Sequence, residues 1–584
     1  MHRDVLARYK RAELPLPDKM WLWPLYGAGF ENLGRDGKPI LVPMPSCGPD
    51  ELLVRHDAVG LCFSDVKVIQ AGDTHPRLQG RDMRANPVVL GHEVALTIVG
   101  VGANLKGQFH VGQRFIIQAD IYVGGKTFAY GYVLPGGLAQ YNIIGKEVLH
   151  GDDGCYLLPI HGDLPYASVA LTEPWSCVEA AYHIDYRTSW QNGGVVWLIG
   201  TPEGAGRDYT FGHPWKEGEK PRLILLTNIP AGLQNAVQAR AATWGIPLIA
   251  TSDLSGAILE KAMSHTEGKG FDDIVILGAN ADIIEAAARL LANGGVLNIV
   301  AQNPLPRPVQ VDVGRLHYDH IALVGTMEAD ISKAYWPIRT EVKPGGKAWF
   351  LGSAGPMGQM LVQYAIESPG RPRVVIGHDL VSRRMGDFEA KFAPLAKSRG
   401  VELYCLSEEA LGTEGFRAKL WEIAPEGYDD IVITAPTPKA VESAMPFIAR
   451  DAVVNIFAGL SRGTFATLDL TPVYQRSLRF TGSSGSGIDD MRRTLTRAET
   501  GALFPSQVVA AVASLGSAYE GLKAVAESRF PGKIVVYLHI NELPLTTLKE
   551  LATRLPKVHA LLERGSIWTK EAEDELLREL LPRT

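Results

Sequence analysis

The stretch Leu351-Gly-Ser-Ala-Gly-Pro-Met-Gly358 decides how the chain folds. It follows the apolar segment 347–351, which predicts a buried strand, and precedes segment 359–366, which predicts a helix. A strand, a glycine-rich turn and a helix form the first half of a dinucleotide-binding unit, in which the helix N-terminus faces the pyrophosphate. The next strand, 373–379, ends in Asp379, where a carboxylate would accept a hydrogen bond from ribose. We therefore predict a dinucleotide-binding domain.

The predicted cofactor site lies in this turn and at the end of the following strand. Gly355 would let the backbone approach a phosphate, and Gly358 would let the helix pack closely on the sheet. Ser353 replaces the first glycine of the usual G-x-G-x-x-G pattern. A glycine-rich turn is also common without a ligand, so the prediction depends on the strand, helix and acid in register. The expected cofactor-binding residues are Gly352, Ser353, Gly355, Pro356, Met357, Gly358 and Asp379.

The composition limits the class of protein. A chain of 584 residues is too long for one hydrophobic core, so we expect several domains. Its 46% hydrophobic and 21% charged residues are ordinary for a globular protein, and the net charge of −6 argues against nucleic acid or an anionic membrane as the main partner. We expect neither a signal peptide nor a membrane span, because no apolar run is long enough. Five scattered cysteines favour a reducing cytoplasm over a disulfide framework.

Three segments of the β-rich region 1–190 carry candidate chemistry. They contain Cys62, the pair His92-Glu93, and Glu173 before a proline. Thiolate, imidazole and carboxylate together form a zinc ligand set, and a catalytic zinc keeps one position open for substrate. Ser64, two residues after Cys62, would relay the substrate's proton. Each segment alone also has a plainer interpretation, namely a buried cysteine, a surface pair and a helix start.

The chain resembles the zinc-dependent medium-chain dehydrogenase/reductase superfamily of alcohol and polyol dehydrogenases, over about residues 20–190 and 343–540. The motifs that carry the resemblance are Gly60-Leu-Cys-Phe-Ser-Asp65, Leu90-Gly-His-Glu93, Val99-Gly-Val-Gly102, Val111-Gly-Gln-Arg114, Thr172-Glu-Pro-Trp-Ser-Cys177, Ala354-Gly-Pro-Met-Gly358 and Gly532-Lys-Ile-Val-Val-Tyr537. The sorbose-1-phosphate reductase and sorbitol dehydrogenase branch is most similar, through Arg114-Phe-Ile-Ile-Gln-Ala119, Tyr428-Asp-Asp-Ile-Val432, Asn455-Ile-Phe-Ala-Gly459 and Thr481-Gly-Ser-Ser-Gly-Ser-Gly-Ile-Asp-Asp-Met491.

The resemblance implies an α/β protein whose GroES-like zinc catalytic domain covers 1–190 and is completed by about 500–540. It implies a Rossmann domain over 343–499 that binds NAD(P). The implied zinc ligands are Cys62, His92 and Glu93; Glu173 would be a further ligand or would hold the zinc-bound water, and Ser64 would occupy the proton-relay position. Many relatives carry a four-cysteine lobe for a second zinc. Only Cys155 lies between Glu93 and Glu173, so we expect one zinc.

Residues 191–342 repeat the domain that follows them. Asp272-Asp-Ile-Val-Ile276 recurs as Asp429-Asp-Ile-Val-Ile433, an offset of 429 − 272 = 157, with 12 identities in the 30 positions of 272–301. Gly325 falls on Gly482 at the same offset. Convergent βαβ patterning is the alternative, but the shared residues at constant spacing favour a duplicated Rossmann-like domain.

The first copy differs from the second where a cofactor would touch it. Glu203 stands in place of Gly355, and Asn228 in place of Asp379. A carboxylate at the turn would repel a pyrophosphate. A polar insertion at about 208–220 follows the turn. We expect that this copy has lost dinucleotide binding and has a structural role, or binds another ligand.

The C-terminal part predicts a helix over Ser506–Ala526 and a strand over 533–538. The tail 541–584 has apolar residues at helical spacing in Thr547–Arg564 and Thr569–Leu581. This pattern predicts a two-helix extension, packed on a partner subunit or solvated.

The sequence and the resemblance together predict an oxidoreductase that interconverts a secondary alcohol and a ketone of a sugar, polyol or sugar phosphate. Asp379 favours NAD(H) over NADP(H), since a 2′-phosphate would meet a carboxylate. Arg383 and Arg384 could weaken this preference, or could simply form a solvated helix face. The partners expected are a small-molecule substrate and further copies of the chain, as a homodimer or tetramer.

Two other classes of function remain open at this stage. The chain could be a lyase or epimerase that retains and recycles NAD during a transient oxidation of a sugar. It could also be a non-enzymatic binding protein on a dehydrogenase scaffold, although the intact Cys62, His92 and Glu93 argue against that.

Overall fold

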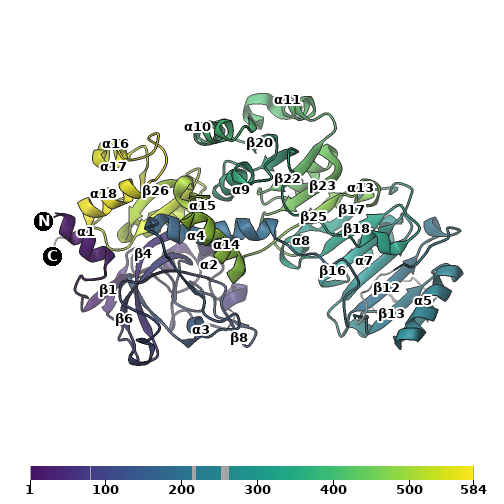
Figure 1. The fold of residues 1–584 in the computed structure, drawn as a ribbon, viewed down its shortest axis with the longest axis horizontal. Coiled ribbons are helices and arrows are strands. Elements are labelled where there is room, and N and C mark those ends of the chain that lie inside the picture. Colours follow the sequence, from purple (N-terminus) through teal and green to yellow (C-terminus); the bar gives the residue numbers. More distant parts are fainter. Residues whose placement is uncertain (1, 79, 213–218, 252–261, 583–584) are drawn as a thin grey trace. The chain divides into compact units, whose positions relative to one another are not determined.

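The chain divides into two compact units, which the computed structural model describes over residues 2–78, 80–212, 219–251 and 262–582 (Figure 1). The first unit contains Met1–Ala180, Ala354–Met360 and Gly485–Thr584, and the second contains Ala181–Ser353 and Leu361–Ser484. Both units mix helices with sheets, which confirms the predicted α/β class. None of the helices in the described ranges is long and apolar enough to cross a membrane.

The first unit is built on an eight-stranded sheet with the path β11-β7-β6-β4-β27-β26-β28, and β10 pairs with β4. The central strand β4 is buried along its whole length because strands flank it on both sides. The sheet strands are β4 (Leu52–Leu61), β6 (Glu93–Val101), β7 (Arg114–Ile117), β10 (Tyr141–Ile144), β11 (Leu157–Pro159), β26 (Val509–Ser514), β27 (Lys533–Tyr537) and β28 (Thr546–Thr547). The remaining strands are β1 (Lys19–Leu22), β2 (Pro24–Leu25), β3 (Ile40–Pro43), β5 (Val88–Val89), β8 (Tyr122–Val123) and β9 (Lys126–Thr127).

The helices of the first unit come from its N-terminal and C-terminal segments. They are α1 (His2–Lys10), α2 (Phe63–Ala71), α3 (Lys146–Leu149), α4 (Tyr166–Tyr182), α14 (Ile488–Glu499), α15 (Ala518–Ala526), α16 (Leu551–Arg554), α17 (Pro556–His559) and α18 (Lys570–Leu580). The predicted helix over Ser506–Ala526 is wrong in its first part, since Val509–Ser514 forms strand β26, parallel to β27. A short apolar run has no decisive period, so pairing with β27 selects the strand.

The C-terminal tail packs on its own chain. The predicted helix Thr547–Arg564 is broken into α16 and α17, because Pro556 lacks the N–H that a continuous helix needs. Glu573 on α18 is buried and accepts hydrogen bonds from the backbone N–H groups of Tyr166 and Ala167, at 2.5 and 2.8 Å, at the start of α4. The tail is therefore packed on the first unit and is not a solvated appendage; a contact with a partner subunit stays a prediction.

The second unit contains two six-stranded parallel sheets with the same topology, β14-β13-β12-β15-β16-β18 and β21-β20-β19-β22-β23-β25. The first has β12 (Val195–Gly200), β13 (Leu223–Thr227), β14 (Leu248–Thr251), β15 (Phe271–Leu277), β16 (Leu291–Val300) and β18 (Ala322–Thr326), with α5 (Ala231–Trp244), α7 (Ala281–Ala288) and α8 (Val313–Tyr318). The second has β19 (Lys347–Leu351), β20 (Val374–Asp379), β21 (Glu402–Ser407), β22 (Tyr428–Ile433), β23 (Ile448–Ile456) and β25 (Arg479–Thr481), with α9 (Pro356–Glu367), α10 (Ser382–Ser398), α11 (Glu408–Ile423), α12 (Pro438–Ala444) and α13 (Thr471–Gln475). The predicted duplication of a Rossmann-like domain is therefore present in the fold.

The repeated Asp-Asp pair is a structural device that both copies share. In the first copy Asp273 is buried and bonds Arg187, whose Nη1 lies 3.0 Å from Oδ2, while Asp272 accepts from the N–H of Val195. In the second copy Asp430 pairs with Arg339 at 2.5 Å, and Asp429 accepts from the N–H of Lys347. In each copy, carboxylates at the start of one strand, β15 or β22, thus bind the first residue of the neighbouring strand, β12 or β19, and the segment that precedes it.

Removing one of these buried carboxylates should destabilise the protein without touching the candidate site. Asp273→Ala leaves the Arg187 guanidinium without its carboxylate, and we expect a loss of about 3 kcal/mol. Thermal unfolding measures this as a lower midpoint. The matched control is Asp208→Ala at an exposed position, which should change stability by less than about 0.5 kcal/mol. Equal midpoints for the two variants would contradict the structural role of Asp273.

Candidate functional site

Three predicted ligand residues meet where two neighbouring strands of the first unit begin and end. Cys62 directly follows β4 and precedes α2, and His92 directly precedes β6, which starts at Glu93. Strands β4 and β6 are antiparallel, with Gly60 opposite Glu93. The Cys62 sulfur, a ring nitrogen of His92 and a carboxylate oxygen of Glu93 all lie within 4.8 Å of one another. The strand pairing thus brings together residues that are about thirty positions apart in the sequence.

Asp65 holds the two ligand segments in place. Its carboxylate is buried and accepts a hydrogen bond from the backbone N–H of Cys62 at 3.0 Å and from that of Gly91 at 3.2 Å. The same carboxylate lies 3.2 Å from Nδ1 of His92. A histidine bound in this way through Nδ1 presents its Nε2 to a metal. The sequence motif contained Asp65, but sequence reasoning assigned it no role.

Glu93 is completely buried and forms an ion pair with Lys533 on β27. Its Oε1 accepts a hydrogen bond from the Lys533 ammonium, which also donates to the carbonyl of Leu61 at 3.2 Å. Burial opposes the charge on Lys533, but Glu93 raises the pKa of the ammonium above its usual value. Lys533 therefore stays protonated. Sequence reasoning missed it, although it lies in the Gly532-Lys-Ile-Val-Val-Tyr537 motif.

The remaining oxygen of Glu93 supports a metal site. Glu93 Oε2 is buried and has no hydrogen-bond partner in the structure. Gly60 is required beside it, because a Cβ at residue 60 would lie 2.1 Å from that oxygen. A carboxylate with an unsatisfied oxygen, in a cluster with a thiol and an imidazole, matches the donor set of zinc. The residues present therefore fit a bound metal ion.

Glu173 and Ser64 lie outside the three-residue cluster. Glu173 is buried on α4, and burial raises its pKa to about 7, opposed by the nearby His92. A carboxyl with this pKa exchanges a proton near neutral pH. Ser64 is half-buried in the first turn of α2, two residues after Cys62. Ser64 is thus close to the cluster in sequence, and Glu173 interacts electrostatically with His92. Neither contributes one of the three converging ligand atoms.

An aromatic and charged shell borders the cluster. The Tyr132 ring lies 5.6 Å from the ring of His92, and the Arg77 guanidinium lies 4.9 Å from the centre of the Tyr132 ring. Arg77 also pairs with Asp120 at 2.5 Å. None of these three was predicted, because no sequence motif contains them and only the fold brings them to the cluster.

The glycine-rich turn of the second copy has the predicted strand-turn-helix form. Gly352 follows β19 with φ of 79°, a conformation that favours glycine, and α9 begins at Pro356. Gly352 and Ser353 donate backbone hydrogen bonds to the carbonyl of His378, each at 2.9 Å. Asp379 ends β20, and Arg384 lies 3.5 Å from its Oδ2. Gly355 directly precedes α9, and Met357 and Gly358 lie in its first turn; phosphate binding by these residues stays a prediction.

The equivalent turn of the first copy is built differently. Among the described residues between β12 and β13, only the three-residue helix Pro202–Gly204 follows the strand, where the second copy has α9. Residues 213–218 of the predicted insertion lie outside the described part of the chain. Glu203 is exposed and accepts hydrogen bonds from Asn280 at 3.0 and 3.1 Å. Helix α9 of the second copy thus has no counterpart among the described residues of this turn.

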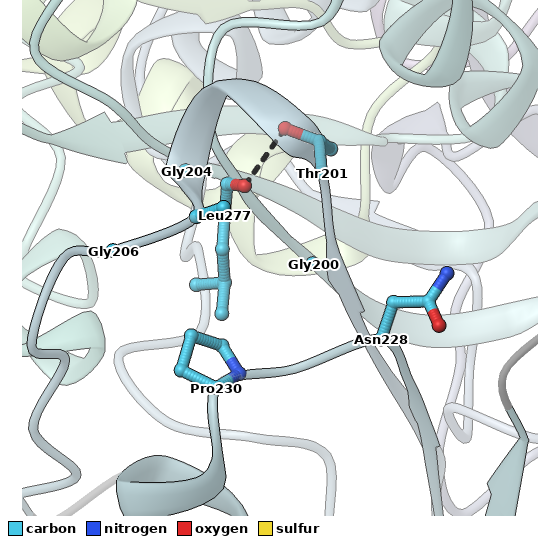
Figure 2. A pocket seen from close by; sticks show the side chains of 8 residues that line it. Gly200, Thr201, Gly204, Gly206, Asn228, Pro230 and Leu277 are labelled. Carbon is cyan, nitrogen blue, oxygen red and sulfur yellow. Dashed lines mark hydrogen bonds between the residues drawn. The ribbon is translucent and has the colours of Figure 1, made fainter.

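A small cavity lies at the carboxyl ends of β12, β13 and β15 (Figure 2). Its volume of about 160 Å³ is below the roughly 300–1,000 Å³ of typical ligand pockets. Figure 2 shows Pro230 and Leu277 on one side and the Asn228 side chain directed away from both. Thr201 closes the upper end by donating a hydrogen bond to the carbonyl of Leu277 at 3.0 Å.

Asp65 provides a test of the metal site. We expect Asp65→Ala to lower affinity for a divalent metal about 10–100-fold, because the His92 ring and both ligand segments lose their common anchor. Competition with a chromophoric chelator measures this affinity. Asp73→Ala, at an exposed position on the same unit, is the control and should keep the wild-type value. Unchanged affinity in folded Asp65→Ala would show that Asp65 does not position the ligands.

Comparison with known proteins agrees with this geometry. Residues 48–151, which include the three-residue cluster, match the alcohol dehydrogenase GroES-like domain family. A mannitol-1-phosphate 5-dehydrogenase of Aliivibrio fischeri is 33% identical over 307 residues, which cover 48% of this chain and 70% of the relative. An L-sorbose 1-phosphate reductase of Klebsiella pneumoniae is 29% identical over 301 residues, covering 48% and 70%.

A third relative matches the chain along nearly its whole length. It is the uncharacterised protein YggP of Escherichia coli, 25% identical over 557 residues, which cover 93% of this chain and 95% of the relative. The converging Cys62, His92 and Glu93, the parallel Rossmann-like sheets and the similarity to the Aliivibrio enzyme all support one assignment. The chain belongs to the medium-chain dehydrogenase/reductase superfamily and is an oxidoreductase.

Proposed function

We propose that the protein is a zinc-dependent, NAD(H)-linked dehydrogenase that interconverts a secondary alcohol and a ketone of a polyol, sugar or sugar phosphate. The observation that carries this proposal is the convergence of ligand atoms from Cys62, His92 and Glu93, together with the buried Glu93 oxygen that has no hydrogen-bond partner. The substrate class is supported by the relatives, which include dehydrogenases named for mannitol 1-phosphate and D-arabitol phosphate and a reductase named for L-sorbose 1-phosphate.

The residues of the cluster would hold the metal and control its charge. Cys62, His92 and Glu93 would be its ligands, and zinc when bound would act as a Lewis acid on the substrate oxygen. Asp65 orients the His92 ring. Lys533 neutralises part of the negative charge of Glu93. A thiolate and a carboxylate together would cancel the charge of a divalent cation. The positive charge of Lys533 would leave the site with a net positive charge, which attracts the oxygen of the substrate.

Oxidation of the alcohol removes a proton from its oxygen and a hydride from its carbon. A bound nicotinamide cofactor would supply the acceptor for this hydride. Ser64 would pass the hydroxyl proton towards solvent. Glu173, with a pKa of about 7, would hold a water molecule or exchange this proton at neutral pH. In the reverse direction the same groups would return the proton to the ketone oxygen.

The second Rossmann-like copy would bind the cofactor. Its turn has the strand, glycine and helix order that a pyrophosphate requires, and Asp379 ends the second strand. A carboxylate there favours the ribose hydroxyls of NAD(H), while Arg384 at 3.5 Å reduces the discrimination against a 2′-phosphate. The first copy, with Glu203 at its turn, would bind no dinucleotide. A cytoplasmic location stays a prediction.

Cofactor binding distinguishes the two copies. Asp379→Ala should weaken NADH binding about 10–100-fold, because a charged hydrogen bond to ribose is lost. The matched substitution Asn228→Ala, at the same point of the first copy, should leave binding unchanged. Titration of NADH fluorescence with each variant measures both. Loss of binding in Asn228→Ala would show that the first copy holds the cofactor.

Metal content tests the proposed zinc site directly. We expect about one zinc per chain in the wild type. Cys62→Ala and His92→Ala should each lose most of this zinc while staying folded, and should lose NAD-dependent oxidation of polyols or sugar phosphates. Elemental analysis and circular dichroism give the first two readouts. Cys155→Ala, at a half-buried position away from the cluster, is the control and should keep its zinc. A zinc-free wild type with full activity would refute the proposal.

A further inference from the structure

The two Rossmann-like copies are joined by a pair of equivalent strands. Strand β17 (Val309–Asp312) of the first copy pairs antiparallel with β24 (Phe465–Leu468) of the second, as a separate two-stranded sheet. Val309 lies opposite Leu468, and Val311 lies opposite Ala466. The duplication offset converts each of these two pairs into the other, since 309 + 157 = 466 and 311 + 157 = 468. The pairing is therefore symmetric between the copies.

The centre of this symmetry is the pair Gln310 and Thr467. They are the same position of the two copies, because 467 − 310 = 157, and they lie directly opposite each other. The Gln310 side chain donates a hydrogen bond to Thr467 Oγ1 at 2.6 Å. Their backbone N–H groups donate to Glu285 and Glu442, which are again the same position, since 442 − 285 = 157. One position of the repeat thus meets itself across a local two-fold axis.

A second contact is also reciprocal. A Cβ at Gly325 on β18 would lie 2.7 Å from Tyr474 Cβ of the second copy. A Cβ at Gly482 would lie 3.0 Å from His317 Cα of the first copy. Because 325 + 157 = 482 and 317 + 157 = 474, the same glycine of each copy makes room for the same helix position of the other. The glycine shared at constant offset in the sequence is therefore an interface residue.

The interface is buried like the interior of a domain. Val309, Val311, Ala466 and Leu468 are almost fully buried and belong to one hydrophobic cluster. The same cluster contains Trp197 of the first copy and Trp349 of the second, and so it is continuous through both sheets. An interface in which residue i contacts j, while the equivalent of j contacts the equivalent of i, is the isologous type that two identical chains form around a two-fold axis.

We propose that the first copy is a built-in partner of the second, so that one chain contains an interface of the kind that normally joins two subunits. The first copy keeps the elements that form this face, namely β17, α8 and β18. It differs from the second copy at the turn and the strand end that a dinucleotide would contact, where it has Glu203 and Asn228. What the first copy retains is thus its partner face, which explains a duplicated domain with a single predicted cofactor site.

The proposal limits how chains can associate. The face formed by β17, α8 and β18 is covered by its counterpart in the same chain, so a second chain has no free copy of that face to bind. The expected homodimer or tetramer stays a prediction, and it would have to use another surface. This inference does not depend on zinc, NAD or the identity of the substrate.

Cysteine cross-linking at the local axis tests the proposal. Residues 310 and 467 form a non-hydrogen-bonded pair of the antiparallel strands, because their N–H groups bond glutamates instead of each other. In Gln310→Cys/Thr467→Cys the two thiols would therefore face each other. Such pairs have Cα atoms about 4.5 Å apart, within the range that a disulfide spans. Mild oxidation of the full-length double variant should form a disulfide within one chain. Intact-mass spectrometry should show the loss of two hydrogens, and non-reducing gels should show no covalent dimer.

The single variants are the matched controls. At a two-fold axis between separate chains, Gln310→Cys or Thr467→Cys alone would meet its own copy and link the chains. Within one chain, each single variant should stay as unlinked as the wild type, which controls for the five native cysteines. Covalent dimers from any variant, or no disulfide in the oxidised double variant, would overturn the proposal.

Discussion

A carboxylate with no exposed surface is stable only when a positive charge or a metal accompanies it, and Glu93 is such a carboxylate. Lys533 supplies the positive charge from β27, at the other end of the first unit's sequence. The chain returns, after 173 + 124 = 297 residues of the second unit, to add β27 beside β4. The pairing of β27 with β4 thus both extends the first sheet and brings Lys533 to the candidate site.

Duplication allowed the two Rossmann-like copies to diverge in one region and stay alike in another. Both copies keep the strand order, the position of the Asp-Asp pair and the glycine that faces the opposite copy. They differ at the first turn, where the second copy has a helix and the first has only a three-residue helical turn among the described residues. The retained residues hold strands together or make room for the opposite copy, and the altered residues lie where a cofactor would bind.

Much of the fold could be predicted from local sequence signals. The glycine-rich turn, the internal offset and the Cys62 and His92-Glu93 segments each have a pattern that residues close in sequence determine. The helix predicted over Ser506–Ala526 is wrong only in its first part, because small and β-branched residues in Val509–Ser514 suit either structure until β27 lies beside them. The helix predicted over Thr547–Arg564 breaks at Pro556, a local signal, because a proline cannot donate the N–H that a continuous helix needs.

The sequence by itself determined the α/β class, the repeat and the residue types of the metal cluster, because periodicity, glycine placement and repeated motifs are local properties of the chain. Only the tertiary structure decided that Asp65 orients His92, that Lys533 neutralises Glu93 and that Gln310 meets Thr467. These contacts join residues that are 27, 440 and 157 positions apart. Partners at such separations are chosen by strand pairing and by the cost of burying unpaired charge, neither of which a single sequence displays.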